Sequence, residues 1–323
     1  MRILVTGGAG FIGSNFIRML IEESYVDHIT VLDSLTYAGR VENLQDLMDR
    51  RNFRFIKGDI CDESLVKDLI PQFTHIVNFA AESHVDRSIS DSSGFIQTNI
   101  VGTHNILQNL QSNREIRFLQ VSTDEVYGSI EFGNWDEDSP LLPNSPYSAS
   151  KASADLLIRS FNKTFGLDTI ITRCSNNYGK YQHPEKMIPR SIINLIQGRK
   201  IELYGQGLNV RDWIHVDDHS KGILLALTIG KSGSTYNFGA DQHLTNVDLA
   251  FLILEKMGMH RDRLEFIQDR KGHDFRYSVS YDKSAKELGY TPSIRITEGI
   301  MDTISWYTSN KEWWQFYEGS KSL

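Results

Sequence analysis

Hydrophobic and polar positions follow two different periodicities along the first half of the chain. Short runs of β-branched and aromatic residues predict strands at residues 2–7, 28–33, 53–59, 75–81, 117–123 and 168–174. Between them, apolar residues recur at helical spacing, as at Phe16, Met19 and Leu20. Because apolar strands alternate with helices, the pattern predicts a parallel sheet covered by helices on both faces.

The second half has a looser pattern. Helical spacing is present near 187–198, 216–229, 245–257 and 296–310, and short strands near 200–204 and 234–239. We therefore expect an α/β fold with a doubly wound parallel Rossmann sheet (1–175) and a smaller C-terminal α/β substrate-binding domain (176–323). Some segments of the second domain should fold back onto the first. The rest should cap the carboxyl ends of the parallel strands, where ligands bind in such sheets.

Composition and charge restrict the class of protein. Of the 323 residues, 40% are apolar and 23% are charged, which is typical of a soluble globular protein. The net charge of −7, without a long basic run, argues against a nucleic-acid partner. Cys61 and Cys174 have no metal-ligand spacing and cannot form a disulfide framework, so we expect a cytoplasmic protein. We also expect neither a signal peptide nor a membrane span, because the N-terminus begins a strand directly and the apolar runs are short.

The segment TGGAGFIGSNF contains a glycine pattern typical of dinucleotide binding. It reads as Gly8-x-Gly10-x-x-Gly13 or, with Gly7, as Gly7-x-x-Gly10-x-x-Gly13. The glycines follow a predicted strand and begin a predicted helix, where the backbone can approach a pyrophosphate. Asp33 ends the next strand, where a carboxylate would bind the adenosine 2′-hydroxyl and repel a 2′-phosphate, so we predict NAD rather than NADP. The alternative is a glycine-rich turn with a surface aspartate.

Two further strand ends have features of a ligand site. Asp59 ends the strand at 53–59, and small residues of the segment NFAAES end the next strand. Small residues allow a flat ligand to approach the strand ends. For Asp59, a contact with the edge of an adenine and an ordinary turn remain alternatives.

The segment VSTDEVYGSI ends another buried strand with Thr123 and two adjacent carboxylates, Asp124 and Glu125. Two like charges side by side repel each other, and burying either one costs free energy. One interpretation is a strand that runs out into a solvated turn. The other is a catalytic acid and base.

The segment NSPYSASKASADLL places Tyr147 and Lys151 on one face of a predicted helix. A free phenol has a pKa near 10, which is too high for a base at neutral pH. A neighbouring ammonium stabilises the phenolate, so we expect Lys151 to lower the pKa of Tyr147. The alternative is two exposed helix residues.

At this point the chain resembles the extended short-chain dehydrogenase/reductases and, within them, the dTDP-glucose 4,6-dehydratases. The resemblance covers nearly the whole chain and is carried by TGGAGFIGSNF, STDEVYG, SPYSASKAS, CSNNYGKYQHPEKMIP and DRKGHDFRY. STDEVYG is the most diagnostic of these segments. Related epimerases lack its adjacent Asp-Glu pair.

The resemblance implies a reaction that uses all of these side chains. Tyr147, as phenolate, takes the proton of the glucose 4-hydroxyl while a hydride moves from C4 to NAD, and Thr123 hydrogen-bonds the same oxygen. The resulting ketone acidifies the C5 hydrogen, which Glu125 removes. Asp124, protonated, gives its proton to the departing 6-hydroxyl. The hydride then returns to C6, so Asp124 must begin neutral and Glu125 charged.

The resemblance also implies which residues contact the ligands. The NAD-contacting positions, besides Tyr147 and Lys151, are Gly7, Gly10, Phe11, Ile12, Gly13, Asp33, Ser34, Leu35, Thr36, Asp59, Ile60, Phe79, Ala80, Ala81, Thr98 and Asn177. The nucleotide-sugar positions are Ser83, Thr123, Asn176, Lys186, Met187, Tyr204, Arg211, Asn246, Arg270 and His273. Arg211 and Arg270 can neutralise a diphosphate by forked hydrogen bonds.

Two features depart from the family pattern. Lys271 stands where many relatives have proline, and the segment between STDEVYG and SPYSASK is short. Neither change affects the carboxylate pair, so the sequence specifies the reaction type more directly than it specifies the nucleobase of the substrate.

No metal site is predicted. His84 and Asp86 have no partner at metal-ligand spacing. The remaining scattered histidines are interpreted as structural in the same way: His183, His215, His219 and His243. Trp313 and Trp314 are interpreted as packing residues.

Two rival interpretations remain. The first is a 4,6-dehydratase of UDP-glucose or another nucleotide hexose, or an epimerase, although the Asp-Glu pair argues against an epimerase. The second is a non-catalytic NAD-binding sensor, against which the complete set of catalytic residues argues.

We also expect a homodimer that pairs through the helix near 95–112 and the helix beginning at Tyr147. The second helix carries more apolar surface than one sheet contact needs, namely Leu156, Leu157, Phe161 and Phe165.

Overall fold

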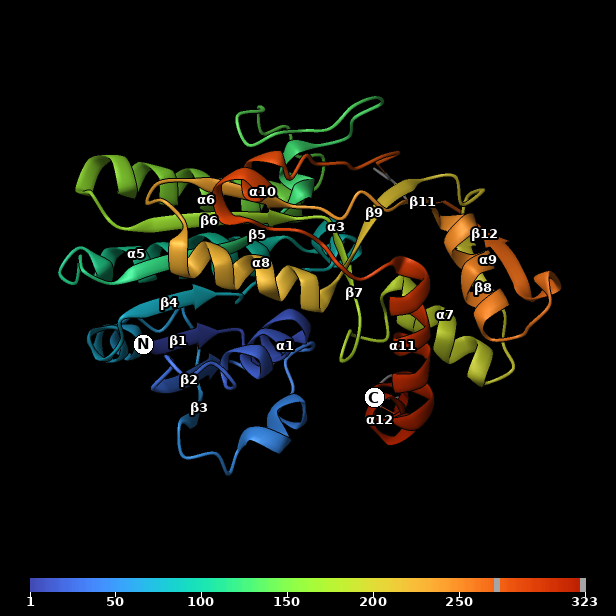
Figure 1. The fold of residues 1–323 in the computed structure, drawn as a ribbon, viewed down its shortest axis with the longest axis horizontal. Coiled ribbons are helices and arrows are strands. Elements are labelled where there is room, and N and C mark those ends of the chain that lie inside the picture. The colour runs from blue at the N-terminus through green and yellow to red at the C-terminus, as the bar shows by residue number, and fades with distance from the viewer. Residues whose placement is uncertain (270–273, 320–323) are drawn as a thin grey trace.

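The protein, a computed structural model that describes residues 1–269 and 274–319, is built on a seven-stranded parallel sheet (Figure 1). The strands lie in the order β10-β6-β5-β4-β1-β2-β3. The order reverses at β1, since the chain continues to β2 and β3 on one side and to β4, β5 and β6 on the other. Their bounds are β1 Arg2–Thr6, β2 His28–Asp33, β3 Phe53–Lys57, β4 His75–Asn78, β5 Arg117–Thr123, β6 Thr169–Cys174 and β10 Thr235–Phe238.

Successive strand residues pack against opposite faces of the sheet, as the pleat of a strand requires. Ile3 and Val5 of β1 belong to one core, whereas Leu4 between them belongs to the other. The first core is covered by α1 (Phe11–Leu20), η1 (Val41–Leu47) and α8 (Val216–Ile229). The second is covered by α2 (Glu63–Leu69), α5 (Thr103–Leu110) and α6 (Pro146–Phe165). This arrangement confirms the predicted parallel sheet with helices on both faces.

The six strands predicted in the first half are present, but two of them are shorter than predicted by more than one residue. β3 ends at Lys57, and the amide of the next residue, Gly58, makes the last hydrogen bond to the Asp33 carbonyl of β2. β4 ends at Asn78, and the small residues that follow form a loop rather than strand.

The helix predicted near 95–112 is interrupted. It consists of α4 (Ser93–Phe95), a π-helical turn η3 (Ile96–Gly102) and α5. The short elements α3 (Val85–Ser90), η2 (Ile70–Gln72) and η4 (Asp124–Tyr127) complete the first half.

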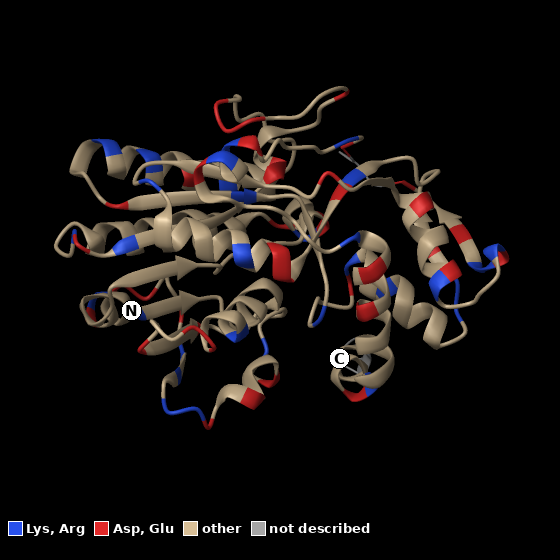
Figure 2. Cartoon of the chain, in the orientation of Figure 1, with Lys and Arg blue, Asp and Glu red and all other residues tan. Residues whose placement is uncertain are grey.

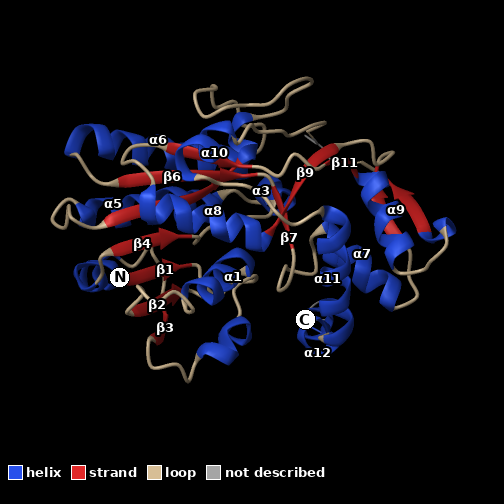
Figure 3. Ribbon diagram, viewed as in Figure 1, coloured by secondary structure: helices blue, strands red, loops and turns tan. Residues whose placement is uncertain are grey.

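The second half forms a smaller unit at the carboxyl ends of the parallel strands (Figures 1 and 3). A three-stranded sheet contains β7 (Asn176–Tyr178), β9 (Val210–His215) and β11 (His243–Thr245), and a two-stranded sheet contains β8 (Ile201–Tyr204) and β12 (Leu264–Ile267). A separate core unites α7 (Met187–Ile196), α9 (Asn246–Lys256), α11 (Ile296–Ser309) and α12 (Lys311–Gly319). The short η5 (Arg261–Arg263) precedes β12.

Part of the second half joins the first sheet. β10 pairs with β6 in parallel, α8 covers the face beside α1, and α10 (Asp282–Leu288) packs against α8 and β10. A boundary at residue 175 divides the sequence, but residues from both sides of this boundary pack together in the first core.

Charged side chains of both signs are interspersed over both halves (Figure 2). Within residues 1–269 and 274–319, no helix combines the length and the apolar character needed to cross a membrane.

Candidate active site

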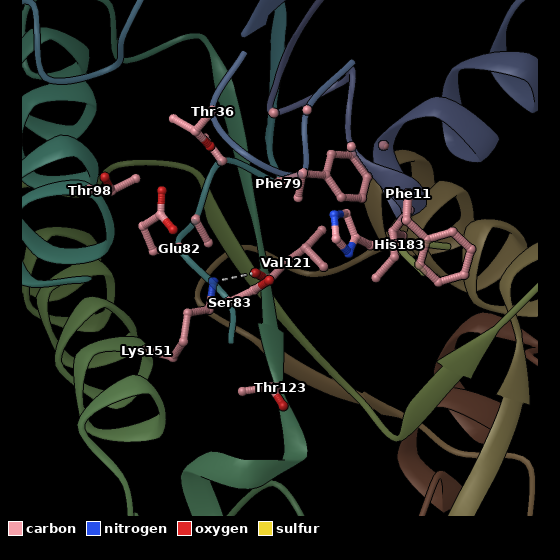
Figure 4. Close-up of a pocket in the computed structure, with 18 of the residues that line it drawn as sticks. Phe11, Thr36, Phe79, Glu82, Ser83, Thr98, Val121, Thr123, Lys151 and His183 are labelled. Atoms are coloured by element: carbon pink, nitrogen blue, oxygen red, sulfur yellow. Dashed lines mark hydrogen bonds between the residues drawn. The ribbon is translucent and has the colours of Figure 1, made fainter. Parts of the chain in front are cut away.

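A cavity of about 310 Å³ opens at the carboxyl ends of β1, β2, β4, β5 and β6. Its remaining wall comes from the segment 174–186, which leads into the smaller unit. Figure 4 shows side chains from widely separated parts of the chain around this space, including Phe11, Thr36, Thr98 and His183. The cavity lies where the strand order reverses, which is the usual place for a ligand in this kind of sheet.

The glycine-rich turn at the end of β1 leaves room for a ligand because side chains are excluded there. Gly7 has a φ of 69°, and a Cβ on it would lie 2.5 Å from the Ala80 nitrogen. A Cβ on Gly13 would lie 2.7 Å from the Gly7 carbonyl oxygen. Gly10 immediately precedes α1, whose first amide groups face the cavity edge. This cradle fits a pyrophosphate.

Asp33 at the end of β2 is buried and held by two backbone amides. Its Oδ2 accepts from Ala9 N at 2.9 Å and its Oδ1 from Leu35 N at 2.8 Å. Burial raises the pKa of this carboxyl, and the two amides oppose that rise. A Cβ on Gly39 would lie 2.6 Å from Asp33 Oδ1, so the loop opposite also approaches closely. The carboxylate faces the cavity as a ribose hydroxyl would require.

The end of β5 places the hydroxyl and the two carboxylates in the cavity. Thr123 Oγ1 lies 3.2 Å from Asp124 Oδ1 and accepts from the Glu125 amide at 3.3 Å, so the chain turns directly into η4. Asp124 is only 4% exposed. Burial, and then the charge of Glu125, hold the pKa of Asp124 well above its ordinary value of 3.8. The solvated-turn interpretation is therefore wrong for Asp124.

α6 brings Tyr147 and Lys151 to the same cavity. The helix begins at Pro146 and is capped by Ser145, whose Oγ accepts from the Ser148 amide at 3.1 Å. Lys151 Nζ donates to the Val121 carbonyl of β5 at 2.8 Å, the dashed line in Figure 4. Burial lowers the pKa of Lys151 to about 8.

The expectation that Lys151 lowers the pKa of Tyr147 is wrong for this structure. Burial, and then the charge of Glu125, raise the pKa of Tyr147, and a hydrogen bond with Thr123 opposes the rise. The ammonium of Lys151 donates to the Val121 carbonyl. Additional positive charge is needed before the phenolate forms at neutral pH.

The cavity gathers most of the residues predicted from the sequence. Besides the catalytic residues, it is lined by Gly7, Gly10, Phe11, Ile12, Gly13, Asp33, Ser34, Thr36, Asp59, Ile60, Phe79, Ala80, Ala81, Thr98 and Asn177 from the NAD set, and by Ser83, Asn176 and Lys186 from the nucleotide-sugar set. Lys186 Nζ lies 3.4 Å from the Ser83 carbonyl oxygen, which links the two halves across the cavity.

Other predicted residues lie outside the cavity lining: Leu35, Met187, Tyr204, Arg211 and Asn246. The guanidinium of Arg211 lies 4.5 Å from the centre of the Tyr277 ring, and its Nη2 donates to the Asp274 carbonyl at 2.9 Å. Its charge still lowers the pKa of Asp124, which places it beside the carboxylate pair. Arg270, Lys271 and His273 lie outside the described residues.

Several lining residues were not predicted as site residues from the sequence, and among them the titratable ones of the cavity edge are Tyr37, Glu82, His183 and Glu185. The His183 ring lies 5.4 Å from the Tyr37 ring, and its Nδ1 lies 3.6 Å from Glu185 Oε1. His183 was interpreted as structural, but it borders the cavity. His84 Nε2 also lies 3.6 Å from Glu185, and no group suited to hold a metal ion occurs in residues 1–269 and 274–319.

Comparisons with known proteins agree with this geometry. A family model described as GDP-mannose 4,6 dehydratase matches residues 4–303. A dTDP-glucose 4,6-dehydratase from Streptomyces niveus is 48% identical over 319 residues, which are 98% of this chain and 95% of that protein. The solved structure of DesIV, a dTDP-glucose 4,6-dehydratase from Streptomyces venezuelae with NAD bound, has a TM-score of 0.95 at 49% identity, covering 97% of this chain and 99% of that one. A UDP-glucose 4-epimerase from Thermotoga maritima has a TM-score of 0.89 at 29% identity, covering 96% and 100% of the two chains.

Proposed function

The chain belongs to the GDP-mannose 4,6 dehydratase family, and from this premise we propose how it acts. It is an NAD-dependent dTDP-glucose 4,6-dehydratase, a lyase that converts dTDP-glucose to dTDP-4-keto-6-deoxyglucose and water. The observation that carries the proposal is the buried Asp124 beside Glu125 at the end of β5, because dehydration needs an acid and a base at adjacent carbons.

The residues that line the cavity have the chemistry needed to bind NAD. The cradle formed by Gly7, Gly10 and Gly13 suits the pyrophosphate, and Asp33 suits the adenosine ribose. When bound, NAD⁺ supplies the hydride acceptor and a positive charge of the kind that Tyr147 needs to ionise.

Each proton transfer of the reaction is assigned to one residue of the chain. Tyr147 accepts the proton of the 4-hydroxyl, and Thr123, with which it shares a hydrogen bond, steadies the same oxygen. Glu125 removes the proton at C5 once C4 is a ketone. Asp124 donates to the departing 6-hydroxyl, which requires the protonated form that its burial favours.

Lys151 and the second half of the chain position the reactants. The buried ammonium of Lys151 is fixed by Val121 and can orient cofactor hydroxyls beside Tyr147. Ser83, Asn176 and Lys186 line the part of the cavity nearest the second half and are the proposed contacts of the nucleotide sugar.

A mass measurement tests the function. Purified protein incubated with dTDP-glucose, without added NAD, should yield a product lighter by one water, which would also show that NAD copurifies. UDP-glucose and GDP-mannose serve as parallel substrates, and turnover of either in place of dTDP-glucose would reassign the nucleobase. If none of the three loses water, even with NAD added, the enzyme assignment is wrong.

We also propose a homodimer through α3, η3 and α6. These neighbouring elements expose Ile89, Ile96, Val101 and Leu156, the last of them 56% exposed. Of the apolar residues expected on this surface, Phe161 is instead buried in the second core, and Leu157 and Phe165 pack against that core.

Light scattering after size exclusion should give two chains per particle. Leu156→Glu should shift this value toward one, because the charge would have to be buried at the interface. The control Ile229→Glu, at an apolar residue of α8 that is 57% exposed on the other face of the sheet, should not. A single-chain particle for the unmodified protein would contradict the proposal. The cytoplasmic location stays a prediction.

A further inference from the structure

Arg173 on β6 is a buried arginine that the proposed reaction does not use. Its side chain is 6% exposed, and that of its partner Asp155 is 1% exposed. Arg173 Nε donates to Asp155 Oδ2 at 2.9 Å, and Nη1 donates to the Tyr127 hydroxyl at 2.7 Å. The Tyr127 hydroxyl donates in turn to Asn237 Oδ1 of β10 at 2.9 Å. We name these four residues the Arg173 clamp.

The two side chains that Arg173 contacts directly belong to elements that carry proposed catalytic residues. Asp155 lies one turn beyond Lys151 on α6. Tyr127 ends η4, the turn that begins with Asp124. The guanidinium of Arg173 also lies 4.7 Å from the centre of the Tyr127 ring, so the turn is held by a stacking contact as well as a hydrogen bond. The clamp therefore joins α6 and η4 through β6.

Stability alone is a weak reason to keep such a pair. Removing two charges from water costs free energy that their attraction often fails to recover, and apolar replacements are often neutral or stabilising. Asp155 Oδ1 has no hydrogen-bond partner among the described residues. This oxygen therefore influences its neighbours through its negative charge and not through a hydrogen bond.

Lys151 lies one turn before Asp155 on the same helix. Burial lowers the pKa of Lys151, and the Asp155 carboxylate is the strongest influence against that fall, followed by Cys174 of β6. Arg173 in turn pairs with Asp155. The other titratable groups around the same cavity are Tyr147 of α6, and Asp124 and Glu125 of η4.

We propose that Arg173 and Asp155 are positioning residues, which hold α6 and η4 against β6 and keep Lys151 as an ammonium at neutral pH. Arg173 fixes the Asp155 carboxylate, and that carboxylate compensates the buried charge one helical turn away. Neither residue lines the cavity, so both act through Lys151 and the turn. The effect on turnover rests on the proposed function, but the effect on Lys151 does not.

The test uses the NAD-loaded enzyme and the double variant Arg173→Met/Asp155→Asn, which removes both charges together. The pKa of Lys151 is measured by carbon NMR of protein labelled at the lysine ε-carbon, with Lys151→Met to assign the signal. We expect the midpoint to fall by about one pH unit. The alkaline limb of kcat with dTDP-glucose should move by the same amount, with kcat at pH 7 about twofold lower and KM nearly unchanged.

A matched control is present in the same sheet. At the start of the same strands, Arg117 Nε donates to Asp168 Oδ2 at 2.8 Å, an Arg–Asp pair of the same chemistry whose side chains are 20% and 30% exposed. Arg117→Met/Asp168→Asn should leave the Lys151 midpoint and the alkaline limb where they are. Asp155→Asn alone, which keeps the shape of the side chain, is a second variant and should shift the midpoint in the same direction.

An unchanged Lys151 midpoint in the clamp variants overturns the proposal. So does a loss of kcat that is equal in the clamp and control variants and leaves the pH profile in place, because the pair would then be merely structural. A wild-type protein that does not dehydrate dTDP-glucose counts against the proposed function alone, since the NMR midpoint needs no substrate.

Discussion

At the scale of single residues, Asp124 combines a chemical advantage with a cost in stability. Its burial raises the pKa of the carboxyl, so the native state binds a proton that the unfolded chain releases near pH 4. The stabilising contribution of this proton is complete below the ordinary pKa of 3.8 and is lost as pH rises through the raised value. At neutral pH the residue therefore destabilises the fold that it serves.

The variant Asp124→Asn should separate the two properties. The amide cannot donate a proton of the required acidity, so kcat should fall about 10²- to 10⁴-fold. NADH absorbance should then accumulate with substrate, since oxidation at C4 does not need Asp124. The melting temperature should exceed that of the wild type at neutral pH, and the difference should vanish toward pH 4. The exposed control Asp138→Asn should change neither quantity, and a lower melting temperature for Asp124→Asn at neutral pH would contradict the argument.

Gly7 offers a second test at this scale because a matched glycine exists elsewhere. Gly7 and Gly166 have nearly the same φ, 69° and 70°, but a Cβ meets the Ala80 backbone only at Gly7 and open space at Gly166. Gly166→Ala should cost about 1 kcal/mol of unfolding free energy, from backbone strain alone. Gly7→Ala should cost more in urea unfolding and should also lose NAD on purification. Equal losses of unfolding free energy and of bound NAD in the two variants would show that the close approach of Gly7 to the Ala80 backbone affects neither stability nor NAD binding.

Residue-scale prediction from the sequence succeeded where a motif fixes both identity and place. The glycines, Asp33 and the Asp124-Glu125 pair all reached the cavity. His183 and Glu185 were missed because they lie in a segment without periodicity, and only the packing of two distant halves brings them to the cavity. The direction of the Tyr147 pKa shift was also missed, since sequence spacing does not reveal how deeply the phenol is buried.

At the scale of elements, α6 has its ends specified by local sequence. Ser145 and Ser148 form a reciprocal cap at its start, and Gly166 adopts the left-handed conformation after its end. Pro146 stands in the first turn, where its missing amide removes no hydrogen bond from the helix.

Removing the cap should weaken the helix that carries the proposed catalytic pair. Ser145→Ala should lower the free energy of unfolding by about 1 kcal/mol, because one helix amide loses its acceptor. The measurement is urea denaturation. Ser153→Ala on the same helix is the control, since Ser153 Oγ donates only to the Ala149 carbonyl one turn back, and it should change stability by less than about 0.5 kcal/mol. If the control loses as much as the cap variant, the cap is not the cause.

The π-helical turn of residues 96–102 shows what the pattern of an element cannot reveal. Over so few residues the periods of α- and π-helices are nearly indistinguishable in the sequence. The turn places Asn99 so that its Nδ2 donates to Ser150 Oγ of α6 at 2.8 Å and its Oδ1 accepts from the Glu82 amide at 2.9 Å. These contacts are made by tertiary packing, which local periodicity does not encode.

At the scale of the whole molecule, the order of the strands depends on non-local pairing. The strand at 235–238 was predicted from its own residues, but its partner β6 lies far away in the sequence. Any short apolar strand could pair at the edge of such a sheet. The sequence therefore predicted that some segment of the second half folds back, but it could not identify β10 as that segment. The same long-range packing brings the C-terminal helix α12 back to the first half.

That return links the end of the chain to the proposed cofactor site. Trp313 Nε1 donates to Asn43 Oδ1 at 2.8 Å, and Asn43 Nδ2 donates to the Ala9 carbonyl of the glycine-rich turn at 2.8 Å. Arg40 Nη1 donates to the Trp313 carbonyl at 2.9 Å, and the Arg40 amide donates to Ala9 as well, at 3.0 Å. Trp313 was interpreted as a packing residue, and here it also holds the loop that borders the cavity.

Trp313→Phe keeps an aromatic ring and removes only the indole donor. One lost hydrogen bond is worth about 1 kcal/mol, so NAD should leave the enzyme roughly fivefold faster, measured by displacement with excess labelled NAD. Trp306→Phe is the matched control, because its ring lies 5.0 Å from that of Trp313 in the same aromatic cluster and borders neither Asn43 nor the glycine turn. The melting temperatures of the two variants should be similar, because both keep an aromatic ring in the cluster. Equal rates of NAD release from both variants would mean that α12 does not affect NAD binding through the loop. A faster release from Trp313→Phe alone would show that α12 stabilises the glycine-rich turn near the start of the chain.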